Sequence, residues 1–304
     1  MFAFSRPSTT ERVFDVVRAA RPSRLFLVCD GARADHAGEA ERVQTVRGLL
    51  ERVDWPCEVE RNYAEANLGC RRRISSGIDW VFTRTEEAIF LEDDTLVDAS
   101  FFPFCDELLE RYRDDDRVQL IGGYNMLGRG PRGGASYWCS AHARIWGWAS
   151  WRRAWQGYDV TMAAWPAAKE MPAWTTRTAN ERALWLNFLD AVKAGTVDTW
   201  DAQLALHAWM AGRVTLIPRT SLVTNIGFGA DSTNTHAPAF PGPPVEAMRF
   251  PLVHPAGLAP DTRLDAAWIR REIARGAAFR RRWVLRGRRV KRLMTRAMTW
   301  VRGR

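Results

Sequence analysis

The chain has 304 residues, of which 46% are hydrophobic, and it carries 44 Lys and Arg against 35 Asp and Glu. This composition excludes an intrinsically disordered chain, and no run approaches the roughly 18 apolar residues of a membrane-spanning helix. The net charge of +9 lies wholly in residues 265–304, where 14 basic and 2 acidic residues give +12, whereas the other residues give −3. The slightly acidic body argues against a nucleic-acid-binding protein.

Strand and helix patterns alternate through the first 125 residues. Strand patterns fall at residues 1–5, 24–31, 57–62, 88–94 and 118–123. Helical patterns lie between them, at about 8–20, 43–53, 70–83 and 100–113, the first opened by Ser8–Glu11 as a capping box. This alternation predicts an α/β fold, with a mostly parallel sheet flanked by helices on both faces.

The second half of the chain is rich in tryptophan and then in proline. Trp148, Trp151 and Trp155 are three and four residues apart, which predicts one helical face, either as core or as a surface for a sugar ring. Further helices are expected near 180–194 and 199–211, followed by a strand at 213–218 and a loop at 225–236. Residues 237–260 hold seven of the fifteen prolines and predict a wrapped or extended segment, before a basic helical stretch from about 262.

The cysteines and the N-terminus indicate the compartment. The segment MFAFSRPSTTERVF lacks the layout of a signal peptide. The five cysteines are scattered and never spaced as CxxC, so we expect neither a disulfide framework nor a zinc site. These features predict a reducing, cytoplasmic environment.

Three acids, Glu92, Asp93 and Asp94, come directly after a strand that reads as buried. Ligands of parallel sheets bind beyond the carboxyl ends of the strands, and Asp30 ends an earlier strand in the same way. If the strand continues, Glu92 and Asp94 share one side and Asp93 takes the other. Two carboxylates on one side suit Mg²⁺ or Mn²⁺ and, through it, a diphosphate. The alternative is an acidic turn in which Asp94 or Thr95 caps the next element of the chain.

The segment AIFLEDDTLVDASFFPFCDELLERYRDDDRVQLIGGYN resembles the GT-A-fold (Rossmann-like) glycosyltransferases. More narrowly, it is similar to bacterial transferases distantly related to N-acetylglucosaminyltransferase I, with an EDD version of the DxD motif. Other blocks agree in order: SRPSTTERVF, LFLVCDGAR, NLGCRRRISSGIDWVF, WGWASWRRAW, TWDAQL and NIGFGADSTNTH. The resemblance implies a GT-A domain over residues 1–240, with a nucleotide-binding part at about 1–125 and an acceptor part at about 126–240. A Pro-rich linker (241–264) and a basic helical C-terminal extension (265–304) would complete the chain.

The resemblance implies roles for the acids and for one arginine at the donor. Asp94 would bind the metal directly, Asp93 would contact the ribose or sugar, and Glu92 would act through metal-bound water. Asp30 would contact the base or ribose of the nucleotide, although Asp-Gly is also a common turn. Arg6 would touch the base or a phosphate, unless it is simply solvated.

Arginine and tryptophan supply further candidates. Arg72 or Arg73, near the start of a helix, would face the diphosphate, the alternative being a solvated helix surface. Trp146, Gly147 and Trp148 would form part of the pocket wall, with Gly147 permitting a close approach of the backbone.

Two residues of the acceptor part complete the set. Asp201 would be the general base of an inverting reaction, although an Asp in a first helical turn is also favoured by the helix dipole. Asp198 is the predicted N-cap of that helix. His236 would be a second metal or phosphate contact, unless it is a surface residue.

The resemblance therefore predicts a metal-dependent, hexosyltransferase-like enzyme that uses Mn²⁺ or Mg²⁺ and a nucleotide-diphosphate sugar, with a UDP-sugar as the expected donor. The acceptor would be a glycan or lipid-linked molecule of bacterial polysaccharide synthesis. The basic tail predicts peripheral binding to the inner face of an anionic membrane; a nucleic-acid stripe and a solvated helix are its alternatives. A nucleotidyltransferase of the same fold would be expected to show a Gly-rich loop after the first strand, which SRPSTTERVF lacks. A non-catalytic relative that binds nucleotide sugars is the remaining alternative.

Overall fold

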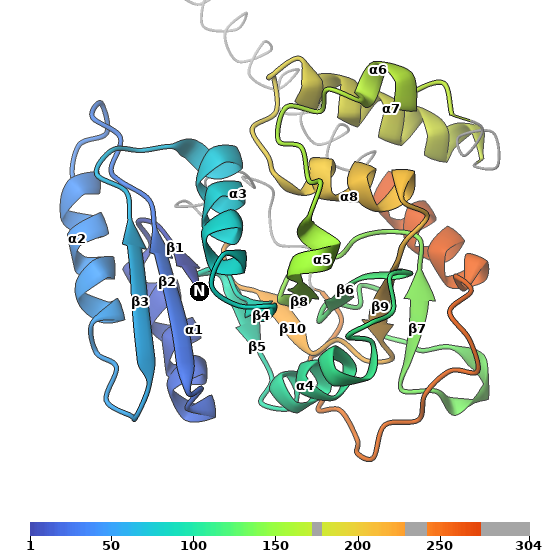
Figure 1. Ribbon diagram of the computed structural model, residues 1–304, viewed down its shortest axis with the longest axis horizontal. Coiled ribbons are helices and arrows are strands. Elements are labelled where there is room, and N and C mark those ends of the chain that lie inside the picture. The colour runs from blue at the N-terminus through green and yellow to red at the C-terminus, as the bar shows by residue number, and fades with distance from the viewer. Residues whose placement is uncertain (172–177, 229–241, 275–304) are drawn as a thin grey trace, which may run out of the picture.

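The computed structural model describes residues 1–171, 178–228 and 242–274 (Figure 1). Its strands are β1 (Phe2–Ala3), β2 (Arg24–Cys29), β3 (Glu58–Tyr63), β4 (Glu87–Phe90), β5 (Thr95–Val97), β6 (Val118–Gly122), β7 (Tyr137–Ser140), β8 (Trp148–Trp151), β9 (Val214–Pro218) and β10 (Val223–Asn225). The helices are α1 (Pro7–Ala20), α2 (Glu39–Leu50), α3 (Gly69–Phe82), α4 (Phe101–Arg111), α5 (Arg152–Trp155), α6 (Trp165–Ala168), α7 (Ala179–Lys193) and α8 (Asp201–Met210). A 3-10 turn at Arg132–Gly134 and a helix at 262–274 complete the described elements.

Two sheets lie side by side, in the orders β1-β2-β3 and β4-β8-β6-β9-β7. They meet where the Phe2 amide donates to the Leu91 carbonyl at 2.8 Å and Phe2 pairs with Glu92 in a parallel bridge. Within these two sheets six of the eight strands run in one direction, and only β7 and β8 oppose them. The predicted α/β fold with a mostly parallel sheet is therefore confirmed. A separate antiparallel pair joins β5 to β10.

Strand β2 shows why helices cover both faces. Successive side chains of a strand point to opposite faces. Val28 accordingly packs in the cluster that holds Ile74 and Ile78 of α3, whereas its neighbour Leu27 packs with Val13 of α1. Each face of the sheet thus has its own apolar core, as the alternation of strand and helix patterns along the chain predicted.

Helix α1 begins two residues earlier than the capping box predicts, because its N-cap is Arg6 and not Ser8. Pro7 occupies the first turn, where its missing amide hydrogen costs nothing, and no side chain caps this end. The hydroxyls of Thr9 and Thr10 donate instead to the Arg6 carbonyl, at 3.2 and 2.7 Å. The capping-box prediction is therefore wrong, and the backbone at Arg6 is held by the first turn of the helix.

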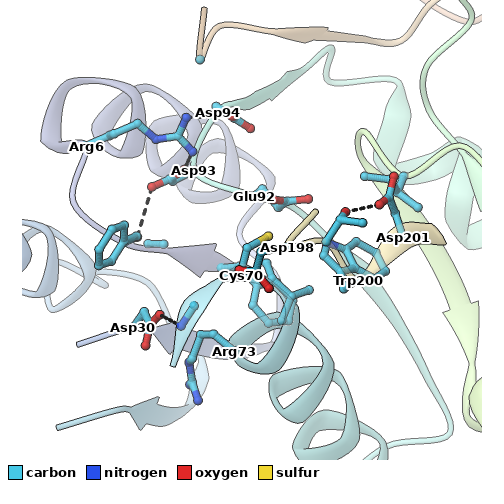
Figure 2. Close-up of a pocket in the computed structure, with 18 of the residues that line it drawn as sticks. Arg6, Asp30, Cys70, Arg73, Glu92, Asp93, Asp94, Asp198, Trp200 and Asp201 are labelled. Atoms are coloured by element: carbon cyan, nitrogen blue, oxygen red, sulfur yellow. Dashed lines mark hydrogen bonds and ion pairs between the residues drawn. The ribbon is translucent and has the colours of Figure 1, made fainter. Parts of the chain in front are cut away.

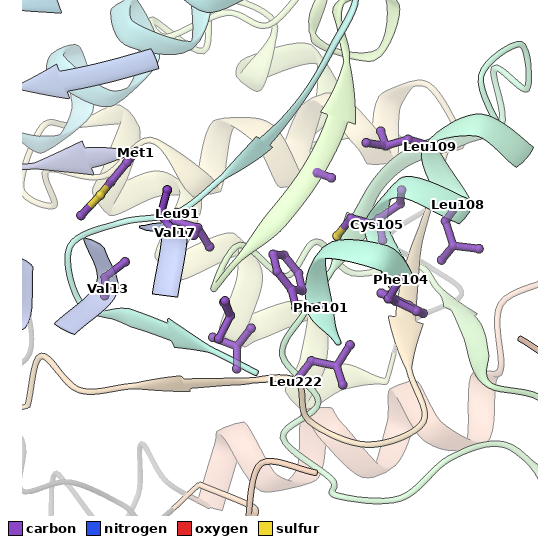
Figure 3. Packing of buried hydrophobic residues seen from close by; sticks show 14 of the residues in the cluster. Met1, Val13, Val17, Leu91, Phe101, Phe104, Cys105, Leu108, Leu109 and Leu222 are labelled. Atoms are coloured by element: carbon purple, nitrogen blue, oxygen red, sulfur yellow. The ribbon is translucent and has the colours of Figure 1, made fainter. Parts of the chain in front are cut away.

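The larger core lies between α1 and α4 (Figure 3). Phe101, Phe104 and Leu108 of α4 have no exposed surface, and Leu91, directly before the acidic triplet, is 5% exposed. Burial of one such side chain stabilises the fold by about 1.5–3 kcal/mol. This packing fixes the end of β4 and so the position of the residues after it.

The tryptophans 148 and 151 do not form a helical stripe. Residues Trp148–Trp151 are strand β8, which runs antiparallel between β4 and β6, and only the four residues after it are helical. Strand alternation places Trp148 and Trp151 in different clusters, on opposite faces of the sheet. The helical prediction was wrong because pairing with two neighbouring strands overrides a local spacing of three and four residues.

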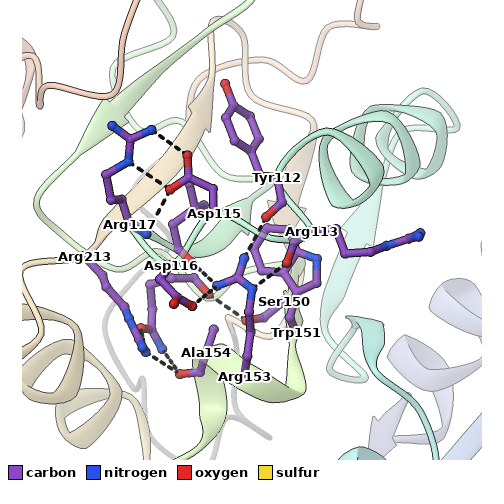
Figure 4. Close-up of polar contacts among 12 residues, drawn as sticks. Tyr112, Arg113, Asp115, Asp116, Arg117, Ser150, Trp151, Arg153, Ala154 and Arg213 are labelled. Atoms are coloured by element: carbon purple, nitrogen blue, oxygen red, sulfur yellow. Dashed lines mark hydrogen bonds and ion pairs between the residues drawn. The ribbon is translucent and has the colours of Figure 1, made fainter.

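Arginines hold the junction between α4, β6 and α5 (Figure 4). Arg153 donates to the carbonyls of Arg113 and Tyr112, at 2.6 and 2.7 Å. Arg213 donates to Ala154 O and to the Gln119 side chain, both at 3.2 Å. The guanidinium groups of Arg153 and Arg213 therefore donate hydrogen bonds to acceptors within the protein.

The proline-rich segment packs on the body from residue 242 onward. Met248 and Leu252 are buried, and Val253 exchanges hydrogen bonds with Ser136, through its own carbonyl at 2.7 Å and its amide at 2.9 Å. The segment is extended and wrapped, as predicted, and the helix at 262–274 comes after it. The rest of the basic tail, 275–304, lies outside the described residues, and the domain boundaries stay a prediction. None of the described helices combines the length and apolarity needed to cross a bilayer.

Candidate functional site

A cavity of about 490 Å³ opens where several strands and helices end (Figure 2). Residues just beyond β1, β2 and β4 line it, together with the first residues of α3 and α8. The carboxyl ends of parallel strands lie along the same edge of a sheet, which is where ligands of such folds bind. Eight of the predicted site residues line this cavity: Arg6, Asp30, Arg73, Glu92, Asp93, Asp94, Trp146 and Asp201.

The acidic triplet is held by Arg6. One nitrogen of the Arg6 guanidinium donates to Asp94 Oδ2 at 2.8 Å, and the other pairs with Asp93 Oδ1. Asp93 also accepts from the Phe4 amide at 3.1 Å. The chain turns at Asp93 and Asp94, so the expected alternation of sides is wrong: both carboxylates reach the same arginine.

Glu92 stands apart from this pair. Within the described part of the chain its carboxylate makes no hydrogen bond or ion pair, although it lines the cavity. Burial raises the pKa of Glu92 well above its usual range, and the nearby charges of Asp94 and Asp93 raise it further. Figure 2 shows Glu92 directed away from Asp94, toward the side on which Asp201 lies. It is therefore the carboxylate of the triplet most in need of a cation.

Asp30 organises the loop that leads into α3. Its carboxylate accepts from the amides of Gly31 and Leu68, both at 2.9 Å, and from the amide of Gly69 and the side chain of Asn67, both at 3.1 Å. Burial raises the pKa of Asp30, while these donors act in the opposite direction. Four internal donors match the acceptor capacity of one carboxylate. These contacts give Asp30 a structural role in the loop before α3, and a direct contact with a nucleotide stays a prediction.

Asp201 begins α8 and faces the cavity from the other side. The Thr199 hydroxyl donates to its carboxylate, and burial raises the pKa of Asp201 against the effect of that hydrogen bond. Trp200, the true N-cap position, is 2% exposed and stacks on Trp148. Asp198 was wrongly predicted as the cap: its side chain is 58% exposed and lines the cavity instead.

The two candidate arginines of α3 lie in different environments. Arg73 is buried and lines the cavity, but its guanidinium donates to the carbonyl and the side chain of Asn62. Arg72 is exposed and borders a different depression, next to Tyr158. The prediction for Arg72 is therefore wrong, because successive helical residues point in different directions and only Arg73 turns inward.

The predicted tryptophan wall is reduced to one residue. Trp146 lines the cavity, whereas Gly147 and Trp148 do not. Trp148 is 2% exposed and stacks on Phe90, with ring centroids 4.4 Å apart, so it belongs to the core. Gly147 does permit a close approach, since a Cβ there would lie 2.8 Å from Val223. His236 lies outside the described residues.

Arg33 and Gly227 are among the lining residues that were not singled out from the sequence. Arg33 approaches the cavity while it pairs with the buried Glu39. Gly227 comes shortly after β10 and lies over the Arg6–Asp94 pair: a Cβ there would lie 2.6 Å from Arg6 Nη1. The preceding amide, of Ile226, donates to the Asp94 carbonyl at 2.8 Å. Gly227 lies within the NIGFGADSTNTH block, so the signal was present in the sequence but not assigned to a residue.

The cavity has an excess of negative charge. Three arginines and six carboxylates line it, for a net charge of −3 when all are ionised; they are Arg6, Arg33, Arg73, Asp30, Glu92, Asp93, Asp94, Asp198 and Asp201. In the described ranges no group of three or more His, Cys, Asp and Glu could hold a metal ion alone. Mg²⁺, however, is commonly bound by one or two carboxylates together with the phosphates of a substrate. The unpaired Glu92 and the nearby Asp94 are oxygen donors that fit such a shared ion.

Comparisons with known proteins give no family. Neither a protein-family model nor a curated protein sequence matches the chain. Among solved structures, the mannosyltransferase PcManGT from Pyrobaculum calidifontis, in complex with GDP-Man and Mn²⁺, is 12% identical and has a TM-score of 0.38, with 68% of each chain covered. A UDP-glucose pyrophosphorylase complexed with UDP-glucose is 9% identical and has a TM-score of 0.36, with 70% of this chain and 78% of that one covered. At such low scores the functional argument rests on the geometry of the cavity itself.

Proposed function

We propose that the chain is a metal-dependent glycosyltransferase of the GT-A fold. It transfers a sugar from a nucleotide-diphosphate sugar to a hydroxyl group of a glycan or lipid-linked acceptor, with inversion at the anomeric carbon. The observation that carries this proposal is the meeting of the acidic triplet and Asp201 in one cavity. That cavity lies at the edge where ligands of parallel sheets bind.

The net negative charge of the cavity explains the need for a metal ion. A diphosphate would be repelled by the excess of carboxylates unless a cation accompanies it. Asp94 would bind Mn²⁺ or Mg²⁺ directly, Glu92 would act through metal-bound water, and His236 is proposed as a further contact. The ion would screen the diphosphate and stabilise it as a leaving group. Arg6, at the same end of the cavity, is placed to offer its guanidinium to a phosphate.

Asp201 has the properties of a general base. Figure 2 shows it on the side of the cavity opposite Asp93 and Asp94, with Glu92 between them. In an inverting transfer the acceptor hydroxyl approaches from the side opposite the leaving group, so its proton acceptor has to lie there. A raised pKa makes the Asp201 carboxylate a better proton acceptor, and the hydrogen bond from Thr199 fixes its orientation.

The nucleotidyltransferase alternative gains no support from the loop after β1. Residues Phe4–Pro7 pass directly into α1 without a glycine. Such an enzyme would need a flexible basic loop around a triphosphate at this place. The membrane-bound or lipid-linked nature of the acceptor rests on the basic tail alone and stays a proposal.

A thermal-shift panel of UDP-, GDP-, ADP- and dTDP-sugars, each with and without Mn²⁺, tests the donor. At a concentration of 100 Kd a ligand stabilises the fold by about 2.7 kcal/mol, which is readily measured. We expect at least one nucleotide sugar to raise the melting temperature with Mn²⁺ and not with EDTA.

Three variants assign the roles. Asp94→Ala should abolish the metal-dependent shift, and the matched control Asp114→Ala, at an exposed site on the surface, should keep it. Asp201→Asn should keep the shift but lose transfer and donor hydrolysis. If no nucleotide sugar shifts the wild-type protein, the proposed function is wrong. If the shift survives but no donor is ever cleaved, the chain is a non-catalytic binding protein.

A further inference from the structure

Arg6 is a fixed cation at the mouth of the cavity. Its side chain is 16% exposed, and it divides its two terminal nitrogens between Asp93 and Asp94, which are 3% and 15% exposed. The hydroxyl of Thr10 and its amide both bind the Arg6 carbonyl, at 2.7 and 3.0 Å, so the first turn of α1 holds the backbone in place. The guanidinium therefore occupies Asp94 Oδ2, an oxygen atom that a divalent ion bound to Asp94 would use.

We propose that Arg6 makes metal binding depend on the diphosphate of the donor. In the protein without nucleotide, the guanidinium neutralises Asp93 and Asp94, so Mn²⁺ or Mg²⁺ finds one paired carboxylate, Asp94, and one free carboxylate, Glu92. When a diphosphate arrives, it offers oxygens to the ion and a new partner to the guanidinium. The ion and the arginine can then share the diphosphate as well as the three carboxylates, instead of competing for Asp94. This inference rests on the proposed function, because it takes the ion and the diphosphate as the ligands of the cavity.

The magnitude can be worked out from Coulomb's law. A divalent ion bound to Asp94 would lie a few ångströms from the guanidinium, because that carboxylate is 2.8 Å from Arg6 Nη1. Even with the dielectric constant of water, repulsion between a divalent and a single charge at such a distance weakens binding about ten-fold or more. Neutralising Arg6 removes this repulsion and also frees the Asp94 oxygen. Both changes should strengthen the binding of the metal ion.

Binding of Mn²⁺, measured by electron paramagnetic resonance and by calorimetry, tests this without any enzyme assay. Wild-type protein should bind Mn²⁺ weakly alone and at least ten-fold more tightly with UDP, GDP or ADP, whichever binds. Arg6→Gln should bind Mn²⁺ alone at least ten-fold more tightly than wild type and gain less from the nucleotide. The control Arg72→Gln removes the same charge from an exposed site outside the cavity and should behave as wild type.

Equal or weaker Mn²⁺ binding by Arg6→Gln, compared with wild type without nucleotide, would overturn the inference. If Arg6→Gln does not fold, Arg6→Lys takes its place: lysine keeps the charge but does not span two carboxylates, so a gain of a few-fold is expected and no gain refutes the proposal. Failure of wild-type protein to bind Mn²⁺ with any nucleotide is a separate result. It contradicts the proposed function, whereas tighter Mn²⁺ binding by the Arg6 variant alone would still support the competition.

Discussion

Replacement of Gly227 by alanine gives the sharpest test of the cavity's geometry. The added methyl would lie 2.6 Å from Arg6 Nη1 and 2.8 Å from Asp94 Cβ, closer than such atoms can approach. The backbone of Gly227 does not adopt a left-handed φ, so alanine is tolerated by the main chain itself. The variant therefore has to separate Arg6 from Asp94, while the pairing of Arg6 with Asp93 can persist.

The cost can be estimated from the contact that is lost. A hydrogen bond to a charged group contributes about 1.5–3 kcal/mol, and the exchange of glycine for alanine returns about 0.4–1 kcal/mol through the unfolded chain. We expect a net loss of about 1–2 kcal/mol in the free energy of unfolding. For a chain of this size that corresponds to a melting temperature lower by roughly 2–4 °C.

Gly48 supplies a matched control. It lies in α2, is exposed, and a Cβ there would meet nothing within 4 Å. Gly48→Ala should therefore stabilise the protein by about 0.5–1 kcal/mol, as in other helices. Urea unfolding followed by tryptophan fluorescence measures both variants. If Gly227→Ala is as stable as Gly48→Ala, Gly227 does not pack against the Arg6–Asp94 pair in the folded protein.

Three further predictions concern the opposite side of the cavity and its wall. Arg71 donates to the Val197 carbonyl at 2.6 Å, so Arg71→Gln should speed hydrogen exchange just before α8 and lower transfer about ten-fold while donor affinity stays unchanged. Because burial raises the pKa of Asp201, ionising it costs stability as pH rises from about 4 toward neutral. Asp201→Asn should therefore gain stability relative to wild type over that interval, as measured by urea unfolding at pH 4 and pH 7. Trp148→Ala should cost about 3–5 kcal/mol in urea unfolding, whereas Trp146→Ala should cost less than half as much and mainly weaken donor binding in the thermal-shift assay.

The position of the cavity could be predicted from the sequence because it is set by strand direction. Asp30 comes directly after β2 and Glu92 two residues after β4, and parallel strands bring such residues to one edge. Asp201 reached the same cavity through the resemblance to known transferases. No local pattern, however, could show that Arg6 pairs with Asp93 and Asp94, since 87 and 88 residues separate them.

Several of the errors come from the influence of neighbouring elements on local patterns. Trp148 and Trp151 have helical spacing, yet β4 and β6 pair with the segment and make it a strand. Arg72 and Arg73 are identical residues at neighbouring positions, so the sequence does not distinguish them. Only the packing of α3 decides which one is buried. In each case the local pattern supplies candidates of the right kind, and the tertiary contacts select among them.

The proline-rich segment covers one edge of the five-stranded sheet. Strand β7 is the last of its sheet, and an uncovered edge strand can template aggregation with another chain. Here Val253 accepts from the amide of Ser136, while Pro260 and Asp261 lie along Cys139, so the free side of β7 is covered. Prolines have no amide hydrogen to offer to a further strand. The ladder of hydrogen bonds thus ends within the molecule. A truncation before residue 261 would expose an edge strand that can pair with another chain.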